Sequence, residues 1–116
     1  MNEIVYEPKC FKKPNAILEG SVKLSAPSIM QRFDYLEECG FEVKADGSVD
    51  VSLNKLAPVK KMIAVSKAHY VSVDVKYKDG SRVLKSVDDL FHDNSCDEML
   101  VEVAAMILQG FSPSKN

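Results

Sequence analysis

Apolar residues recur at helical spacing in three parts of the chain, and each part carries signals for the end of a helix. The first part begins with Ser25, a candidate N-cap, and Pro27 in the first turn, and it ends at Gly40, which suits the left-handed position after a helix. Its apolar stripe consists of Ile29, Met30, Phe33 and Leu36. This spacing predicts a helix whose stripe packs on the core.

Two more helices are predicted in the second half of the chain. One begins near Pro58, and the clearest follows Ser95, because Ser95 and Glu98 have the spacing of a capping box and Gly110 ends the apolar run. Ser86 can cap a short helical turn over residues 87–91. The last helix has more apolar residues than one stripe requires, so it lies either at the centre of the domain or partly against a neighbour.

Alternating apolar and polar positions predict strands. Val71, Val73, Val75 and Tyr77 alternate with polar residues, which predicts a strand. Asp79–Gly80 is typical of a tight hairpin turn, and a return strand is predicted over residues 82–84. A second Asp-Gly pair, Asp46–Gly47, separates two alternating runs within residues 41–51 and predicts another hairpin. Val22 and Leu24 also alternate with polar residues, with Gly20 marking a bend or bulge.

These elements predict an α+β fold, dominated by helices, with one or two short β-hairpins. An all-α fold is the alternative, because the predicted strands are short. A chain of 116 residues with 46% apolar residues can bury one core, so we expect one domain over residues 1–110. Residues 1–24 are a poorly defined N-terminal segment by pattern, and residues 111–116 are expected to form a flexible tail.

Composition excludes several classes of function. The net charge of −2 gives no general attraction to nucleic acid, so no nucleic-acid partner is expected. No apolar run approaches the ~18–20 residues that cross a bilayer, so no membrane association is expected. The first 13 residues do not resemble a secretory signal, and three widely spaced cysteines are typical of reduced thiols in a cytosolic protein.

The charges are divided into two blocks. Residues 54–85 contain eight Lys or Arg and two acids, whereas residues 87–110 contain six acids and no Lys or Arg. The interpretation we favour is that the blocks are two solvated faces of one domain, which can also neutralise each other across it. The other interpretation is head-to-tail contact between copies, which would build a ring or an open spiral.

No motif for catalysis or cofactor binding is present. The sequence contains no phosphate loop, nucleophile elbow, zinc-protease motif or EF-hand loop. His92 is close in sequence to Cys96, a possible nucleophile, and to Asp88 and Asp89, possible metal ligands. The spacing favours an acidic loop with a helix cap instead, and His69 is expected to be a structural imidazole. We therefore expect no catalytic residue, cofactor or metal.

The C-terminal half resembles the tail assembly chaperones of long-tailed, lambda-like bacteriophages. The resemblance covers about residues 54–116 and rests on the order of four segments: Val71–Val75, Lys78–Ser81 with its Asp-Gly turn, Lys85–Leu90 with Ser-x-Asp-Asp-Leu, and Leu100–Lys115 ending in Gly-Phe-x-Pro-x-Lys. More loosely, it includes Ser25–Gly40 as the helix expected after a short N-terminal region. Residues 1–24 match nothing in the family.

The resemblance implies a non-catalytic, self-associating protein of the host cell cytoplasm that binds the tape measure protein and assists tail-tube subunits to assemble. A homo-oligomer is therefore expected. Methionine repacks easily around different partners, so Met30, Met62, Met99 and Met106 are candidates for an adaptable surface, with core packing as the alternative. The predicted interface combines apolar and charged residues: Met99, Val103, Met106, Ile107, Lys60, Lys61, Asp88 and Asp89.

Two other functions remain as alternatives. A small virion structural subunit, such as a tail or head–tail joining protein, would use the same hairpins and complementary charges to form a ring. A small enzyme that uses Cys96 or His92 is the third possibility.

Overall fold

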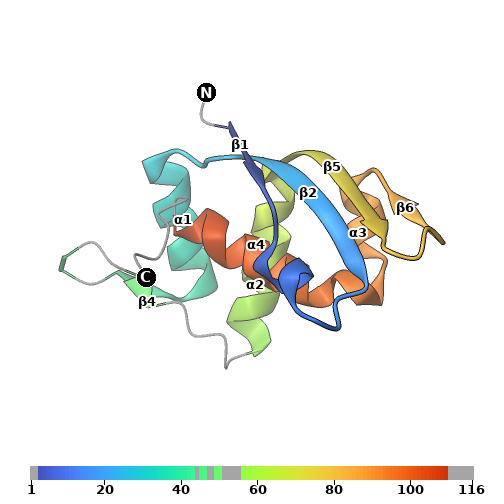
Figure 1. Cartoon of the computed structure of the whole chain (residues 1–116). Helices are drawn as coiled ribbons and strands as arrows, with labels where there is room; N and C mark the ends of the chain where they lie inside the picture. The colour runs from blue at the N-terminus through green and yellow to red at the C-terminus, as the bar shows by residue number, and fades with distance from the viewer. Residues whose placement is uncertain (1–2, 44, 47–48, 51–55, 110–116) are drawn as a thin grey trace.

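The computed structural model describes residues 3–43, 45–46, 49–50 and 56–109. Within these residues four α-helices accompany a four-stranded antiparallel sheet, so the fold is α+β as predicted. The sheet lies across one side of the molecule with helix α4 behind it, and α1 lies at the opposite end of the molecule from β6 (Figure 1). The all-α alternative is wrong, because strands distant in sequence pair over long stretches.

The sheet has the order β1-β2-β5-β6, with β1 (Glu3–Tyr6) and β6 (Val83–Leu84) at its two edges. The central strands are β2 (Leu18–Ser25) and β5 (Tyr70–Tyr77), which pair along seven registered positions from Leu18↔Tyr77 to Leu24↔Tyr70. The segment over residues 1–24, which the pattern left undefined, therefore supplies an edge strand and most of a central strand. The predicted hairpin of β5 and β6 is present, and β2 joins it to β1 in one sheet.

Alternation explains which face of the sheet is buried. Val22 and Leu24 of β2 and Val73 and Val75 of β5 are buried, while the residues between them are partly or fully exposed. Gly20 lies where β2 passes close to the backbone of β5. Its φ is +122°, and a Cβ there would lie 2.1 Å from the Asp74 carbonyl oxygen. The bend predicted at Gly20 is thus a place that admits no side chain.

The helices are α1 (Ile29–Cys39), α2 (Leu56–Ser66), α3 (Val87–Phe91) and α4 (Asp97–Leu108). Three short 3₁₀ turns are present in the described residues: η1 (Lys9–Lys12) between β1 and β2, η2 (Lys67–His69) after α2, and η3 (Asn94–Cys96) before α4. Gly40 ends α1 in the left-handed conformation, and Ser86 caps α3 by accepting from the Asp89 N–H, both as predicted.

Two predicted caps are wrong. The cap of α1 is Ser28, which forms a capping box with Gln31, because Ser25 is still paired in β2. Ser95 does not cap α4 either, since it lies inside η3, where the side chain of Asp93 accepts from the Ser95 N–H. In both cases a neighbouring element uses the residue that local pattern assigned to the cap.

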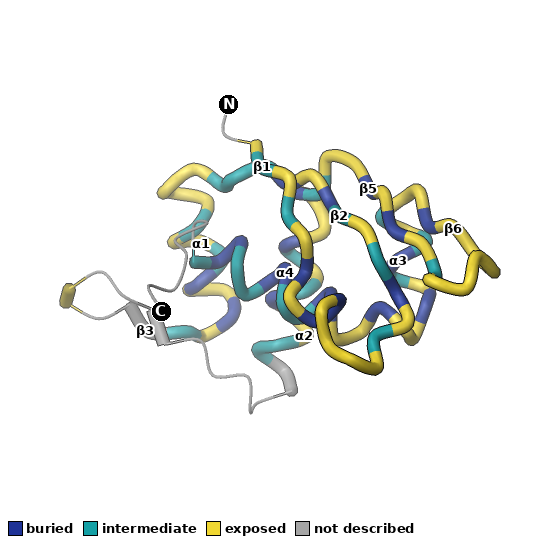
Figure 2. Tube along the Cα trace, viewed as in Figure 1, coloured by how far each residue is buried: buried dark blue, intermediate teal, exposed yellow. Residues whose placement is uncertain are grey.

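The core lies between the sheet and helices α2 and α4. Figure 2 shows dark blue, buried positions concentrated along α4 and on alternate positions of β2 and β5. The predicted hairpin within residues 41–51 pairs as β3 (Glu42–Val43) and β4 (Val49–Asp50). Gly47 in its turn, Gly110 and the predicted tail over residues 111–116 lie outside the described residues.

Candidate functional site

Most of the apolar residues predicted to form the interface lie in the core. Met99, Val103 and Ile107 of α4 are at most 1% exposed, and Met106 is half-buried. The excess of apolar residues in α4 therefore reflects its position at the centre of the domain, one of the two alternatives that the sequence left open. The three buried side chains are covered by the core, so they are not accessible to a partner in this structure.

The charged residues predicted for the interface are on the surface. Lys60, Lys61 and Asp88 are exposed and Asp89 is half-buried. The carboxylate of Asp88 lies 2.8 Å from the Lys67 ammonium, which lowers the pKa of Asp88 below its ordinary value. The Asp89 carboxylate accepts from a backbone N–H, that of Lys85.

The basic and acidic blocks meet within one copy. Lys67 of the basic block pairs with Asp88 of the acidic block, and Arg82 pairs with Asp93 at 3.0 Å. The interpretation that we favoured is thus confirmed for these pairs.

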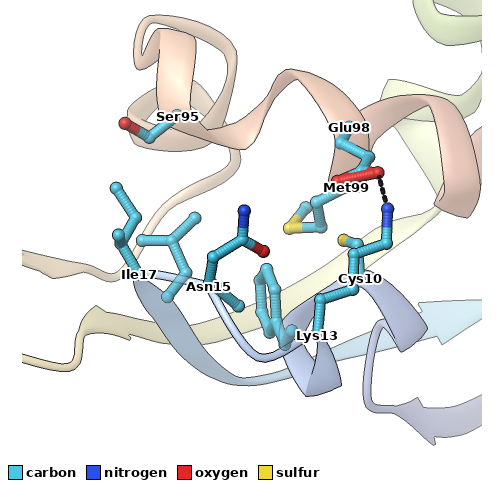
Figure 3. Close-up of a pocket in the computed structure, with 10 residues that line it drawn as sticks. Cys10, Lys13, Asn15, Ile17, Ser95, Glu98 and Met99 are labelled. Carbon is cyan, nitrogen blue, oxygen red and sulfur yellow. Dashed lines mark hydrogen bonds and ion pairs between the residues drawn. The ribbon is translucent and has the colours of Figure 1, made fainter.

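A small cavity lies between η1 and the start of α4 (Figure 3). Its volume is about 190 Å³, and Cys10, Asn15, Ser95 and Met99 are among the residues that line it. Lys13 and Glu98 form an ion pair beside it, which Figure 3 shows as a dashed line. Burial first, and then the charge of Glu102, raise the pKa of the Cys10 thiol to about 12, so this thiol is neutral near pH 7 and a poor nucleophile.

Glu102 of α4 holds the N-terminal segment in place. Its carboxylate accepts from the Tyr6 hydroxyl and from the backbone N–H groups of Lys9 and Cys10, the latter two at 2.6 and 3.0 Å. Burial and then this hydrogen bond raise the pKa of Tyr6. Glu102 therefore has a structural role, and the sequence pattern contained no signal for it because its partners are more than 90 positions away.

The His92 and Cys96 side chains are not arranged for nucleophilic catalysis. The His92 ring bonds to the Asp88 carbonyl at 2.8 Å, and Cys96 is fully buried, which raises the pKa of its thiol to about 11. His69 is buried, with its ring nitrogens 2.8 Å from the Tyr35 hydroxyl and 3.0 Å from the Ser25 carbonyl. No group of three His, Cys, Asp or Glu within the described ranges has the geometry of a metal site.

Helix α1 exposes apolar residues that its pattern assigned to the core. Of the predicted stripe, only Leu36 is buried, whereas Ile29 and Met30 are 63% and 65% exposed and Phe33 is 40% exposed. We call these three residues the α1 apolar surface. The core-facing side of α1 instead includes Arg32, whose Nε donates to the Leu108 carbonyl at 2.6 Å.

The packing of α1 decides which of its apolar residues are covered. The helix contacts α2 and the end of α4, and these contacts turn Tyr35, Leu36 and Cys39 inward. Of the four methionines considered for an adaptable surface, Met62 and Met99 are buried and Met30 is the exposed one. A contiguous group of exposed apolar residues that includes a methionine is typical of a surface that binds another polypeptide.

Comparisons with family models, curated proteins and solved structures found no match for this chain. Among its described helices, none has the length and apolar character needed to cross a membrane.

Proposed function

We propose that this protein is a phage tail assembly chaperone that binds the tape measure protein, without catalysis, while tail-tube subunits assemble in the host cell cytoplasm. The observation that carries the proposal is the α1 apolar surface, Ile29, Met30 and Phe33, which nothing in the described part of the chain covers. The resemblance over residues 54–116 supplies the identity of the partner.

The chemistry of the surface suits an apolar helical client. A tape measure protein that has not yet assembled exposes apolar helical faces, which aggregate in water unless another surface covers them. The unbranched side chain of Met30 and the flat ring of Phe33 adapt to different apolar neighbours without a fixed polar geometry. The surface is flanked by acidic residues of the same helix, Asp34 and Glu37, which keep the free chain soluble.

Co-expression with the tape measure protein tests the proposal. We expect the wild-type chain to raise the soluble fraction of the tape measure protein and to co-purify with it. Met30→Lys should abolish both effects, because it places a charge within the apolar surface. Ile17→Lys is the matched control, since Ile17 is 53% exposed but lies away from α1.

A soluble complex that survives Met30→Lys would contradict the role of α1, and the absence of any complex would contradict the chaperone function. Purified virions give a second test. A chaperone is expected to be absent from mature particles, whereas many copies per particle would support the structural-subunit alternative.

A further inference from the structure

The two edges of the sheet are complementary to each other. Each edge strand carries one large, exposed apolar residue: Val5 of β1 is 69% exposed and Val83 of β6 is 51% exposed. Exposed valines on edge strands are unusual, because they promote pairing with another chain. The charges beside these valines differ in sign, with Lys85 after β6 and Glu3 on β1, whose carboxylate also lies 3.4 Å from the Lys23 ammonium.

Val83 turns its backbone groups to the open edge. The Tyr77 N–H donates to the Arg82 carbonyl at 2.9 Å, and Leu84 is registered with Val75. In an antiparallel sheet successive residues direct their backbone groups to opposite neighbours. Arg82 and Leu84 therefore bond to β5, and the N–H and carbonyl of Val83 lie on the side where no strand is described.

The same alternation, followed across the register, places the backbone groups of Val5 on the other open edge. The backbone N–H and carbonyl of Tyr77 point to β6, so those of Asp74, three residues away, point to β2. Asp74 is registered with Ser21, and the backbone groups of Ser21 therefore point to β5. Val22 then faces β1 and bonds to its partner Tyr6. Val5, next to Tyr6, directs its N–H and carbonyl away from the sheet.

We propose that β1 of one copy pairs with β6 of the next copy, antiparallel, with Val5 opposite Val83. In this register the N–H and carbonyl of Val5 form two hydrogen bonds with the carbonyl and N–H of Val83 in the next copy. It also places Glu3 opposite Lys85 and Ile4 opposite Leu84, so that each side of the joined sheet is matched. The strand directions fit, because all neighbours in the order β1-β2-β5-β6 are antiparallel.

The alternative of two identical β1 edges is less favourable. With Val5 opposite Val5, the antiparallel register places Glu3 opposite Glu7, and like charges directly opposite each other destabilise a strand pair. The β1-to-β6 contact joins different surfaces and leaves one edge free at each end, so it adds further copies until a ring closes or a spiral grows. The contact joins copies without the tape measure protein and does not use the α1 apolar surface.

Sedimentation velocity of the purified chain tests this contact. The edges are short, so we expect weak, concentration-dependent association with a dissociation constant of about 100 μM. Val5→Lys and Val83→Lys should each weaken association by about tenfold or more, because an edge lysine opposes strand addition. Ile17→Lys is the matched control: Ile17 is 53% exposed just before the central strand β2, and the change there should leave association unaltered.

Mixing the two variants gives the sharpest outcome. The Val5→Lys chain retains its β6 edge and the Val83→Lys chain retains its β1 edge, so an equal mixture should form one species of twice the 12.9 kDa chain mass and no larger one. Glu3→Lys and Lys85→Glu should each weaken association about two- to fivefold, and the double variant should recover it. Circular dichroism checks that every variant is folded.

A wild-type chain that stays monomeric up to about 1 mM would overturn the proposal. So would association that survives either edge variant alone, or a mixture that forms no dimer. These results concern the purified chain, so they are distinct from a failure to bind the tape measure protein in co-expression.

Discussion

The hydroxyl of Tyr77 lies 2.9 Å from Oδ1 and 2.7 Å from Oδ2 of Asp93. The same carboxylate accepts from Arg82 Nη1 at 3.0 Å and from the Ser95 N–H at 2.9 Å. Asp93 is 7% exposed, whereas the side chain of its partner Arg82 is 50% exposed, so the cluster lies at the edge of the core. They join the β5–β6 hairpin to η3 and so set where α4 begins.

Asp93→Asn should therefore destabilise the protein by about 1–2 kcal/mol, because the half-exposed Arg82 side chain and the Tyr77 hydroxyl lose their charged acceptor. Urea unfolding followed by circular dichroism measures the change. Asp34→Asn, at an exposed position of α1, is the control and should have little effect. An equal loss in both variants would show that the contacts of Asp93 contribute nothing specific.

Asp93 should also make stability depend on pH. Its pKa is lowered from 3.8, first by the hydrogen bond from Tyr77 and further by the Ser95 N–H and the charge of Arg82. A carboxyl group with a lowered folded-state pKa contributes stability above its unfolded pKa and loses it as pH falls toward the folded value. Unfolding free energy should thus decrease below about pH 4 in the wild type, and less steeply in Asp93→Asn. Parallel pH profiles would contradict this account.

Two glycines give a matched test of backbone packing. Gly20→Ala should cost more than about 3 kcal/mol or prevent folding, because its Cβ would lie 2.1 Å from the Asp74 carbonyl oxygen. Gly40→Ala should cost only about 1–2 kcal/mol, since its φ is +77° but no atom lies within 4 Å of the added Cβ. Thermal melting of both variants measures the difference. Similar losses would contradict the close approach of β2 and β5.

Tyr70 carries a buried hydroxyl for which no hydrogen-bond partner is found among the described residues. Tyr70→Phe removes this unsatisfied group and should leave stability unchanged or raise it by about 1 kcal/mol. Tyr35→Phe is the contrasting change, because its hydroxyl lies 2.8 Å from His69 Nε2 and its loss should cost about 1 kcal/mol. The denaturant concentrations at the unfolding midpoints of the two variants measure these changes. A clear loss in Tyr70→Phe would reveal a partner for its hydroxyl.

Glu102→Gln should loosen the N-terminal segment, because a neutral amide is a weaker acceptor for Tyr6 and for the backbone of Lys9 and Cys10. We expect a loss of about 2 kcal/mol and about 30-fold faster amide exchange at Lys9 and Cys10. Hydrogen exchange followed by NMR measures both residues directly. Glu98→Gln, which breaks the exposed ion pair with Lys13, should leave these rates unchanged. Equal acceleration in both variants would contradict the anchoring role.

Elements set by neighbours in sequence were predictable. The alternation over 71–77, the Asp79–Gly80 turn and the Ser86 cap each depend on residues within one turn or strand, and the structure contains all three. Caps next to another element were not predictable. Ser25 has the chemistry of an N-cap, but pairing with Glu3 keeps it in β2, and the helix begins three residues later.

The amino-acid sequence by itself determined the helices and the β5–β6 hairpin, but not β1, because periodicity and turn chemistry act over a few residues. Tertiary structure decided which faces those segments bury. Packing against α2 and α4 left Ile29, Met30 and Phe33 of α1 exposed and placed Met99 and Ile107 at the centre. It also brought Glu102 to the N-terminal segment and left Val5 and Val83 on opposite sheet edges. These features depend on packing and register between segments distant in the sequence, which no local pattern encodes.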